Sequence, residues 1–517
     1  MDRRTFLTTG LAVSAGAVAT AAGAPGWGGQ LASAVTAPGR RHRLPWDQLR
    51  RHLTGQLILP SDQAYEQAHR LAAAQFDSIH PQAVARCATE RDVATCIAFA
   101  QEHSVPSAVR SGGHSFAGFS TTQGLIIDVS EFRQVRVGPS SVHVGPAAQM
   151  VDIVSALSPR GLSVPGGFCP TVCPGGFISG GGMGWMYRKY GPASDRVLSA
   201  RVMLANGRTV TASPRQNPDL YWAIRGGGGG NFGVVLDYEL APTSESRVGY
   251  FTLTWPWAQA DSVLGQLQEW FARTSAELAP RAGILLNNAA PGAVPTVIVT
   301  GVHFGSRAAL DADLAELTSM IGSAPATRVV DELSYQQASM RQFGCTNDSV
   351  EQCHLSGANP EALLPRQQFV LNRTRMHDKA ISDSGLDEIL TAFDADRRAG
   401  QYRYLGLLSL GKNANRPAPG DTAYVHRRSS LFSVFTAGLS SPTPNSEDRA
   451  AAVDWARGGF RAVDSHSNGH TYVNYPDLEL SNWEWAYYGT NYPRLLEVKR
   501  AYDPHRFFRF SQGVGAR

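Results

Sequence analysis

Three features of the 517-residue sequence predict an α+β fold in which a second domain is inserted into the first. Short apolar segments alternate with helical segments between Ala83 and Leu240. At about Ser246 the pattern changes to strands with long amphipathic helices. After Pro444 a helical segment leads into an aromatic-rich tail. Strands and helices mixed in blocks of this kind are typical of α+β architectures.

The first block is predicted to contain short elements that lead into glycine-rich loops. We expect helices at 62–75, 91–103 and 152–158, the second of them preceded by Thr89 in an N-cap segment. Strands are expected at 83–87, 106–110, 124–129, 135–137 and 234–240, with a hairpin at 202–210 around Asn206-Gly207.

The inserted block is predicted to be a sheet covered by helices. Strands are expected at 251–255, 297–302, 368–372, 402–410 and 429–435, and amphipathic helices at 260–278 and 307–321. A further helix is expected at 448–460. The resulting boundaries are a leader at 1–24, a linker at 25–50, a first domain at 51–245, an insert at 246–445 and a returning C-terminal segment at 446–517.

The N-terminus is similar to a twin-arginine export signal. Arg3 and Arg4 precede Phe6 and Leu7, and a small-residue apolar run follows that is too short and too rich in Ala and Gly to span a bilayer. We therefore expect secretion with cleavage between Ala21 and Pro25, and no stable membrane association afterwards. The net charge of +4 is small for this length, so composition gives no case for nucleic acid.

Six cysteines in an exported chain invite disulfides. Cys345 and Cys353 lie close together in a polar segment and are expected to pair. Cys87 and Cys96 are expected to be buried thiols. A metal site is not expected: His466 and His470 have HxxxH spacing, but the residues between them are typical of a turn, and no Glu follows the first His.

The stretch from Gly166 to Gly191 holds nine glycines, two cysteines and no acidic residue. A backbone without Cβ atoms can approach a flat ligand closely, and successive N–H groups bind phosphate oxygens. A second glycine-bearing segment, Arg110 to Gly118, carries His114, as the first carries Cys169. Two such loops predict a large cofactor held from both sides and bonded to both. For either loop alone, an ordinary glycine-rich surface loop is the alternative.

A third glycine-rich segment matches the dinucleotide-binding fingerprint in its glycine spacing but not in its expected secondary structure. Gly228, Gly230 and Gly233 have the GxGxxG spacing, but that fingerprint requires a strand before it and a helix after it. Here a helical segment precedes and the strand at 234–240 follows. We therefore predict no NAD-binding Rossmann site.

Six segments together resemble the berberine bridge enzyme-like flavin oxidases, which have the vanillyl-alcohol oxidase type of FAD-binding fold. In this sequence they are RSGGHS at 110–115, the FCPTV to RKYG run at 168–191, GGGGGNFGVV at 226–235, YVNYPD at 472–477, YYGTN at 487–491 and YDP at 502–504. They span about residues 80 to 512, and the insert matches only loosely. The resemblance implies a two-part FAD-binding domain with an inserted substrate domain.

The resemblance also implies how FAD is held. His114 is expected to be bonded to the 8α-methyl group of the flavin and Cys169 to its C6 atom. The expected cofactor-binding residues are Arg110, Ser111, Gly112, Gly113, His114, Ser115, Gly118, Cys169, Thr171, Val172, Gly175, Gly176, Ser179, Gly180, Gly181, Gly182, Gly184, Gly229, Gly230, Asn231, Phe232, Gly233, Val234, Tyr472 and Asn474. Cys173 stands where the family usually has Gly. It is expected to be a free buried thiol, a competing nucleophile or a disulfide partner of Cys169.

Tyr472 and Asn474 are the expected catalytic residues. In a strand at 472–475 both would lie on one face, toward the flavin. A phenolate serves as a base once its surroundings lower the pKa of about 10. Tyr475 is the fallback, and a tyrosine with a purely structural role is the alternative. His426 and Tyr404 are expected to be structural.

Two departures from the family pattern affect the expected mechanism. Many sugar and alcohol oxidases of the family have a second tyrosine where this chain has Met183, and often a histidine where it has Phe177. A methionine does not hydrogen-bond strongly and does not help to lower the pKa of Tyr472. This favours a non-sugar substrate or a modified mechanism.

The resemblance implies an exported oxidase that dehydrogenates a C–OH or C–N bond of a carbohydrate or secondary metabolite. Hydride transfer to flavin N5 and reduction of O2 to H2O2 are the expected chemistry, and Val172 occupies a position that the family associates with oxygen access. A flavin dehydrogenase with another electron acceptor and a non-catalytic exported flavin-binding protein are the alternatives. The pattern sets no oligomeric state.

Overall fold

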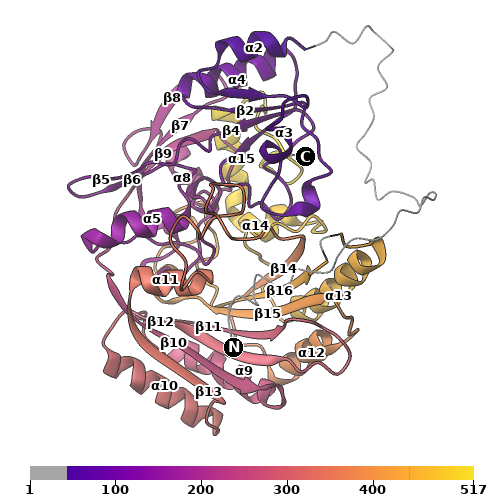
Figure 1. Cartoon of the computed structure of the whole chain (residues 1–517). Helices are drawn as coiled ribbons and strands as arrows, with labels where there is room; N and C mark the ends of the chain where they lie inside the picture. Colours follow the sequence, from indigo (N-terminus) through magenta and orange to yellow (C-terminus); the bar gives the residue numbers. More distant parts are fainter. Residues whose placement is uncertain (1–43, 442, 517) are drawn as a thin grey trace.

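The computed structural model describes residues 44–441 and 443–516, which form two lobes (Figure 1). The upper lobe contains a four-stranded and a five-stranded sheet, and the lower lobe is built on one seven-stranded sheet. The α+β prediction is confirmed, and the first strand of the lower lobe begins at Arg247. The predicted leader at 1–24 and most of the predicted linker lie outside the described residues.

The four-stranded sheet has the order β1-β2-β4-β3, with β2 and β3 parallel to β4 and β1 antiparallel to β2. Helices α2 and α4 cover it through Leu49, Val93 and Ile97. Thr89 caps α4 in a capping box with Asp92. The elements are α2 (Trp46–His52), β1 (Gln56–Ile58), α3 (Tyr65–Ala68), η1 (Ala74–Phe76), β2 (Ala83–Arg86), α4 (Glu90–Glu102), β3 (Ser107–Arg110) and β4 (Leu125–Asp128).

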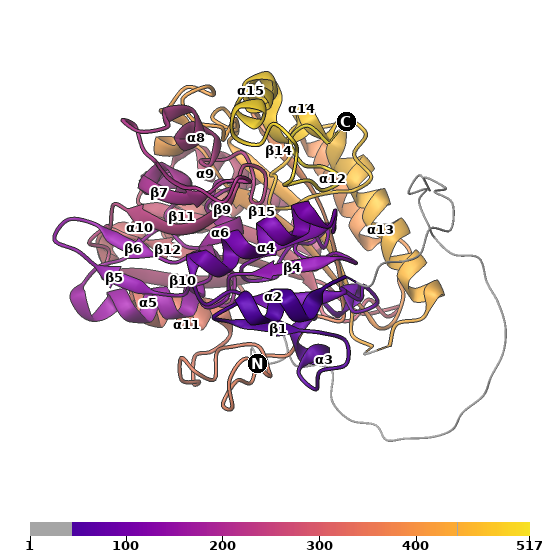
Figure 2. The same cartoon turned by 90° about the horizontal axis from the view of Figure 1, so that it is seen from above.

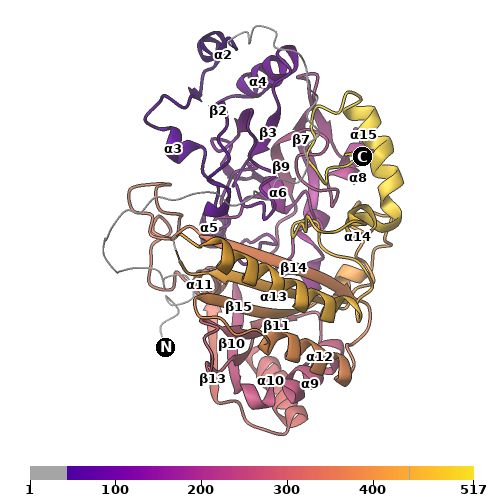
Figure 3. The ribbon, with the colours of Figure 1, turned by 90° about the vertical axis from the view of Figure 1, so that its right-hand side faces the viewer.

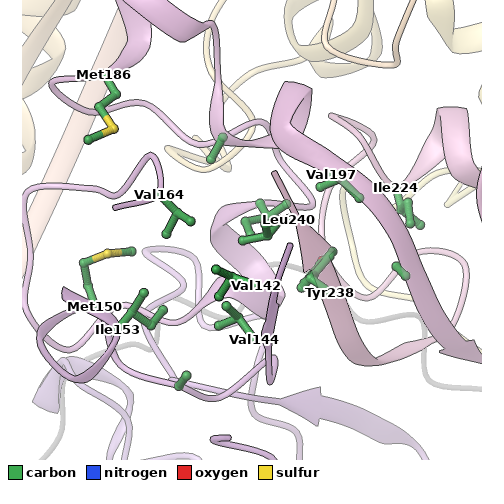
Figure 4. Packing of buried hydrophobic residues seen from close by; sticks show 14 of the residues in the cluster. Val142, Val144, Met150, Ile153, Val164, Met186, Val197, Ile224, Tyr238 and Leu240 are labelled. Carbon is green, nitrogen blue, oxygen red and sulfur yellow. The ribbon is translucent and has the colours of Figure 1, made fainter. Parts of the chain in front are cut away.

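The five-stranded sheet is antiparallel with the order β5-β6-β9-β7-β8. Val142, Val144 and Leu240 of this sheet pack with Met150 and Ile153 of α5 in the core that Figure 4 shows. The elements are β5 (Val135–Val137), β6 (Val142–Val144), α5 (Met150–Leu157), η2 (Ser158–Arg160), α6 (Pro174–Phe177), α7 (Tyr187–Tyr190), η3 (Ala193–Arg196), β7 (Val197–Met203), β8 (Thr209–Ala212), α8 (Pro218–Ala223) and β9 (Val234–Leu240).

The seven-stranded sheet of the lower lobe is antiparallel with the order β13-β10-β12-β11-β15-β16-β14. Its elements are β10 (Arg247–Pro256), η4 (Trp257–Gln259), α9 (Ala260–Arg273), β11 (Leu278–Leu286), β12 (Thr296–His303), α10 (Arg307–Ile321), β13 (Thr327–Ser334), α11 (Tyr335–Phe343), β14 (Phe369–His377), α12 (Asp383–Asp394), β15 (Gln401–Ser409), η5 (Lys412–Asn415) and β16 (Leu431–Leu439).

The two faces of this sheet serve different purposes. Leu405 and Leu407 of β15 pack against helices α9, α10 and α12 in the core of the lower lobe. The next side chain along the strand, Leu408, points to the opposite face of the sheet. Leu408 is paired with Phe432 of β16, and both side chains join a cluster that contains Tyr472. Because side chains alternate along a strand, one face forms the lobe's core and the other faces the upper lobe.

The C-terminal segment serves both lobes. Its first helix, α13 (Ser446–Asp464), lies along β14 and β16 (Figure 3), and Trp455 is buried in the lower core. The chain therefore returns to the upper lobe after α13, later than the predicted boundary at 446. Helices α14 (Trp483–Tyr488) and α15 (Tyr492–Tyr502), separated by η6 (Gly489–Asn491), complete the upper lobe, where α15 packs on α8 (Figure 2).

Several predicted helix boundaries are wrong. The segment 62–75 is not one helix, because Arg110 donates to the carbonyl groups of Ala68 and His69, which a continuing helix would use. The helix predicted at 260–278 ends at Arg273, and Leu278 begins β11. The predicted linker also ends too late, because α2 begins at Trp46. No helix of the described residues is long and apolar enough to cross a bilayer.

The predicted strand at 472–475 is also wrong. The N–H of Tyr475 donates to the carbonyl oxygen of Tyr472, which closes a turn directly before Pro476. The predicted disulfide is confirmed, since Cys345 and Cys353 are bonded, and Cys87 and Cys96 are buried free thiols as expected.

Candidate active site

A cavity of about 480 Å³ lies between the lobes, and residues of both lobes line it. The glycine-bearing segments wall it from the upper lobe, and the turn at 472–475 closes another side. The expected site residues that line it are Ser111, Gly112, Gly113, His114, Ser115, Cys169, Thr171, Val172, Gly175, Gly176, Ser179, Gly229, Gly230, Asn231, Phe232, Gly233, Tyr472 and Asn474. Four segments that lie far apart in the sequence thus meet at one cavity.

Backbone N–H groups are the main polar feature of the upper wall. Within residues 44–441 and 443–516, the N–H groups of Gly112, Gly113 and Ser115 donate to no protein acceptor, and neither do those of Gly229 and Gly230. Rows of free N–H groups bind anions such as phosphate.

Gly176 shows why this wall needs glycine. A Cβ atom placed there would meet no protein atom within 4 Å, although the residue lines the cavity. The side chain would therefore occupy the cavity itself. A Cβ atom on neighbouring Gly229 would lie 3.2 Å from the Gly176 Cα atom, so the two glycine segments touch through their backbones.

The remaining expected site residues do not line the cavity. Arg110 is buried in an ion pair with Asp128 at 2.6 Å, so its side chain braces the four-stranded sheet and is not part of the cavity lining. Its expected direct role in cofactor binding is not supported by this geometry. The other expected residues that do not line the cavity are Gly118, Gly180, Gly181, Gly182, Gly184 and Val234.

His114, Thr171 and Cys169 form one contact group in the wall. The Thr171 hydroxyl lies 2.9 Å from His114 Nε2 and 3.7 Å from Cys169 Sγ. Burial lowers the pKa of His114 to about 4, so its imidazole is neutral at pH 7. Burial raises the pKa of the Cys169 thiol, while hydrogen bonds from Thr171 and Val172 act in the opposite direction.

Cys173 is separate from this group. Both Cys169 and Cys173 are free, which contradicts a disulfide between them. The Cys173 thiol donates to the carbonyl oxygen of Ala147 at 3.3 Å, and burial raises its pKa strongly. A protonated, hydrogen-bonded thiol is a poor nucleophile, so the geometry favours the free buried thiol among the three expected roles.

Tyr472 and Asn474 are adjacent in the cavity wall, although they do not lie in a strand. The Tyr472 phenol oxygen accepts from the Gly182 N–H at 2.6 Å and from Asn474 Nδ2 at 2.7 Å. Asn474 is held in turn because Nδ2 also donates to the Phe177 carbonyl oxygen at 3.0 Å. The turn at 472–475 thus brings together the two side chains that the sequence singled out.

The pKa of Tyr472 is raised, contrary to the direction expected from the sequence. Burial is the largest cause, and the hydrogen bonds from Gly182 and Asn474 oppose it. Met183 packs in the same cluster and adds no hydrogen bond to the phenol. Tyr475 also lines the cavity, and burial raises its pKa to about 12.

His426 and Tyr404 are not among the cavity-lining residues. His426 is buried between the rings of Tyr424 and His470. The ring of Tyr404 packs over Gly283 and Gly406 of the seven-stranded sheet. Both positions agree with the structural roles expected for them.

The apolar part of the cavity wall was not predicted from the sequence. Leu408 and Phe432 come from strands that were predicted, and their alternation with core residues was the available signal. The loop after the disulfide had no such signal. The missed lining residues include Phe116, Phe119, Leu355, Leu364, Gln367, Leu408, Phe432, Tyr487, Phe510 and Gln512.

Comparison with known proteins matches both parts of the upper lobe. Residues 81–213 match a family model described as FAD binding domain, and residues 471–515 match one described as berberine and berberine like. The second match contains the turn with Tyr472 and Asn474. In both segments the chain is similar to the berberine bridge enzyme-like FAD-linked oxidoreductases. It is therefore an FAD-dependent enzyme.

Similarity extends over most of the chain. An uncharacterized FAD-linked oxidoreductase of Bacillus subtilis, YgaK, is 27% identical over 89% of this chain and 97% of its own length. A chitooligosaccharide oxidase of Gibberella zeae is 26% identical over 84% of this chain and 87% of its own length. The solved structure of a Physcomitrella patens berberine bridge enzyme-like protein superposes with a TM-score of 0.80 at 24% identity, over 91% of this chain and 99% of that one. The expected fold is thereby confirmed.

The residues that line the cavity fit FAD. The free N–H groups at 112–115 and 229–230 suit the pyrophosphate, and the opening at Gly176 leaves room that a side chain would fill. His114 and Cys169 present a nitrogen and a sulfur from the same wall. A flat cofactor with an anionic linker matches this donor set.

Proposed function

We propose that this chain is an exported, covalently flavinylated oxidase that dehydrogenates a C–OH or C–N bond of a sizeable small molecule and passes electrons to O2, giving H2O2. The observation that carries the proposal is the pair of N–H donors on the Tyr472 phenol oxygen. These donors lie beside a cavity that fits FAD. Such an arrangement prepares the tyrosine to act as a base.

The upper lobe would hold the cofactor. His114 and Cys169 are the proposed attachment points, and the N–H groups at 112–115 and 229–230 would bind the pyrophosphate. FAD, when bound, supplies the two-electron acceptor for the oxidation.

Tyr472 is the proposed base for the substrate hydroxyl proton. Both acceptor positions of its oxygen are occupied, by the N–H groups of Gly182 and Asn474, and its own O–H donates to no acceptor within the described part of the chain. The phenol is thus oriented to exchange a proton with a ligand in the cavity. Hydrogen bonds to the oxygen favour the phenolate, while burial favours the phenol. The bound state must therefore supply further stabilisation of the phenolate.

The lower-lobe wall favours an apolar or aromatic secondary metabolite as the substrate. Leu355, Leu364, Leu408 and Phe432 line the cavity from this lobe, and the amide of Gln367 is the polar side chain among the lining residues of this lobe. Sugars are recognised through several hydrogen bonds, and unpaired buried hydroxyl groups are costly. A carbohydrate is the second candidate, and the chitooligosaccharide oxidase relative supports it.

Oxygen as the acceptor is supported by Val172, a small aliphatic residue of the cavity wall. Export is supported by the paired arginines Arg3 and Arg4. Export through the twin-arginine pathway would deliver the protein already folded around its cofactor.

The test is to mix the purified protein with candidate donors, first without oxygen and then in air. Flavin bleaching without oxygen, followed by recolouring and H2O2 formation in air, supports an oxidase. Bleaching with recolouring only by an artificial acceptor indicates a dehydrogenase. Flavin that no aromatic alcohol, amine or oligosaccharide reduces would contradict the proposed catalysis and indicate a binding protein.

A further inference from the structure

The Thr171 side chain contacts both proposed attachment points. Its single hydroxyl contacts both the imidazole of His114 and the sulfur of Cys169, at 2.9 Å and 3.7 Å. All three residues line the same cavity. Within the described part of the chain, Thr171 is the only threonine that lines this cavity. One hydroxyl therefore lies between the two proposed attachment points.

The directions of the two hydrogen bonds follow from what each nucleophile needs. A neutral imidazole attacks through the nitrogen that carries no hydrogen, and the other nitrogen then carries an N–H. If Nε2 carries the hydrogen, the Thr171 oxygen must accept it. The Thr171 hydrogen is then free to point to Cys169 Sγ. A donor to sulfur stabilises the thiolate, which is the reactive form of cysteine.

We propose that the Thr171 hydroxyl prepares both residues for flavin attachment, by accepting the Nε2–H of His114 and donating its own hydrogen to Cys169 Sγ. This proposal rests on the covalent attachment proposed above. In this arrangement the Nδ1 lone pair of His114 is the nucleophile. Within the described residues Nδ1 has no hydrogen-bond partner, and His114 lines the cavity.

The electrostatics of the group agree with this assignment. Burial lowers the pKa of His114 to about 4, so the imidazole has a free lone pair at neutral pH. Burial raises the pKa of Cys169, and the Thr171 hydroxyl is one of the groups that lower it. The Thr171 hydroxyl thus acts together with the backbone groups of Thr171 and Val172 in lowering the pKa of Cys169, and its contact with Nε2 orients the imidazole of His114.

Each attachment balances with O2 as the oxidant. One bond forms between the protein nitrogen or sulfur and a ring-system carbon, and one hydrogen is lost from each partner. The two protons and two electrons released per bond are taken up by O2, which gives one H2O2. The Nε2–H of His114 is the proton that histidine loses after the bond forms at Nδ1, and it is one of the two protons taken up in H2O2.

The experiment compares Thr171→Val with Thr171→Ser in the full-length protein. Valine keeps the shape and removes the hydroxyl, whereas serine keeps the hydroxyl. Thr243→Val is the matched control, because Thr243 is a buried threonine of the same lobe that hydrogen-bonds to Ser163 away from the cavity. Covalent flavin is measured by intact mass after acid denaturation, and reversibly bound FAD is measured in the acid supernatant.

Thr171→Val is expected to carry about one fifth as much covalent flavin as the wild type, because the loss of one hydrogen bond corresponds to about a fivefold effect. It is still expected to bind FAD reversibly. Thr171→Ser and Thr243→Val are expected to match the wild type. Combination with His114→Ala isolates the cysteine attachment. In that background Thr171→Val is expected to shift the pH dependence of attachment to higher pH, which a purely structural loss would not do.

Two outcomes separate this proposal from the one on which it rests. Covalent flavin in the wild type and equally in Thr171→Val overturns the role of Thr171 alone. Absence of covalent flavin in the wild type overturns the attachment itself, and the role of Thr171 with it. If Thr171→Val does not fold, Thr171→Ala removes the hydroxyl without adding an apolar methyl group, and the same comparison applies.

Discussion

The Gly182 N–H donates to the phenol oxygen of Tyr472 at 2.6 Å, across 290 residues of sequence. Gly182 has φ +91°, a backbone conformation that residues other than glycine rarely adopt. This conformation directs the N–H toward the Tyr472 oxygen. A hydrogen bond to a phenol oxygen favours the phenolate. The glycine-rich run thus contributes to the proposed chemistry as well as to the cofactor wall.

Replacement of the proposed base tests this relationship. Tyr472→Phe is expected to lower the rate of flavin reduction about 10²- to 10⁴-fold, because the substrate proton loses its acceptor. Stopped-flow absorbance measures this rate without the oxygen step. Tyr475→Phe is the matched control and is expected to keep most of the rate. A larger loss in Tyr475→Phe than in Tyr472→Phe would transfer the role to Tyr475.

Removal of the second donor should change the pH dependence. Asn474→Leu removes the Nδ2–H bond to Tyr472, so the phenolate is less stable and the pKa of Tyr472 rises further. The rate at neutral pH is expected to fall about tenfold or more, and the rising limb of the pH–rate profile to move to higher pH. Met183→Leu, in the same cluster, is expected to keep the midpoint of that profile. An unchanged profile in Asn474→Leu would contradict the assignment.

Buried neutral histidines should make the fold sensitive to acid. His377 is fully buried, and burial lowers its pKa from 6.5 to about 4. Between pH 6.5 and about pH 4, His377 therefore binds a proton in the unfolded chain but not in the folded chain. Stability is present above that pH and is lost as pH falls toward 4, by on the order of 3 kcal/mol.

Thermal unfolding between pH 7 and pH 4 measures this effect. His377→Gln is expected to show a smaller drop in melting temperature over that range than the wild type, whatever its stability at pH 7. His505→Gln, at an exposed position, serves as the control. An equal drop in the wild type and in His377→Gln would show that other groups cause the acid sensitivity.

Arg110 should matter for stability more than for binding. Arg110→Met leaves Asp128 buried without its partner and is expected to destabilise the fold by about 3–5 kcal/mol. Arg201→Met removes an exposed ion pair with Glu90 and is expected to cost less than about 1 kcal/mol. Denaturant unfolding compares the two. If Arg110→Met has normal stability but binds FAD weakly, Arg110 contributes directly to FAD binding, as the sequence motif implied.

Much of the fold was predictable, because periodicity decided the long elements. The helix predicted at 307–321 has the bounds of α10, and the strand at 234–240 has those of β9. β11 was hidden because Pro280 and Gly283 interrupt its apolar pattern. The alternation of residues 472–475 predicts a strand, but the hydrogen bond from the Tyr475 N–H to the Tyr472 carbonyl oxygen, three residues back, closes a local turn instead.

The candidate site was predictable as a set of residues but less so as a geometry. Motifs named the glycine segments, His114 and Cys169, and these meet at the cavity. Motif membership did not reveal that the Arg110 side chain points toward Asp128, because a motif does not give side-chain directions. The contact of Thr171 with both nucleophiles depends on the path of the loop in space, which no spacing rule gives.

Covalent attachment is tested most directly by the intact mass of the acid-denatured protein, with wild type compared with His114→Ala, Cys169→Ala and the double variant. We expect a mass increment of one FAD in the wild type and in each single variant, and none in the double variant. Loss of the increment in His114→Ala alone would mean a single histidyl bond. A wild-type mass without flavin would contradict covalent attachment.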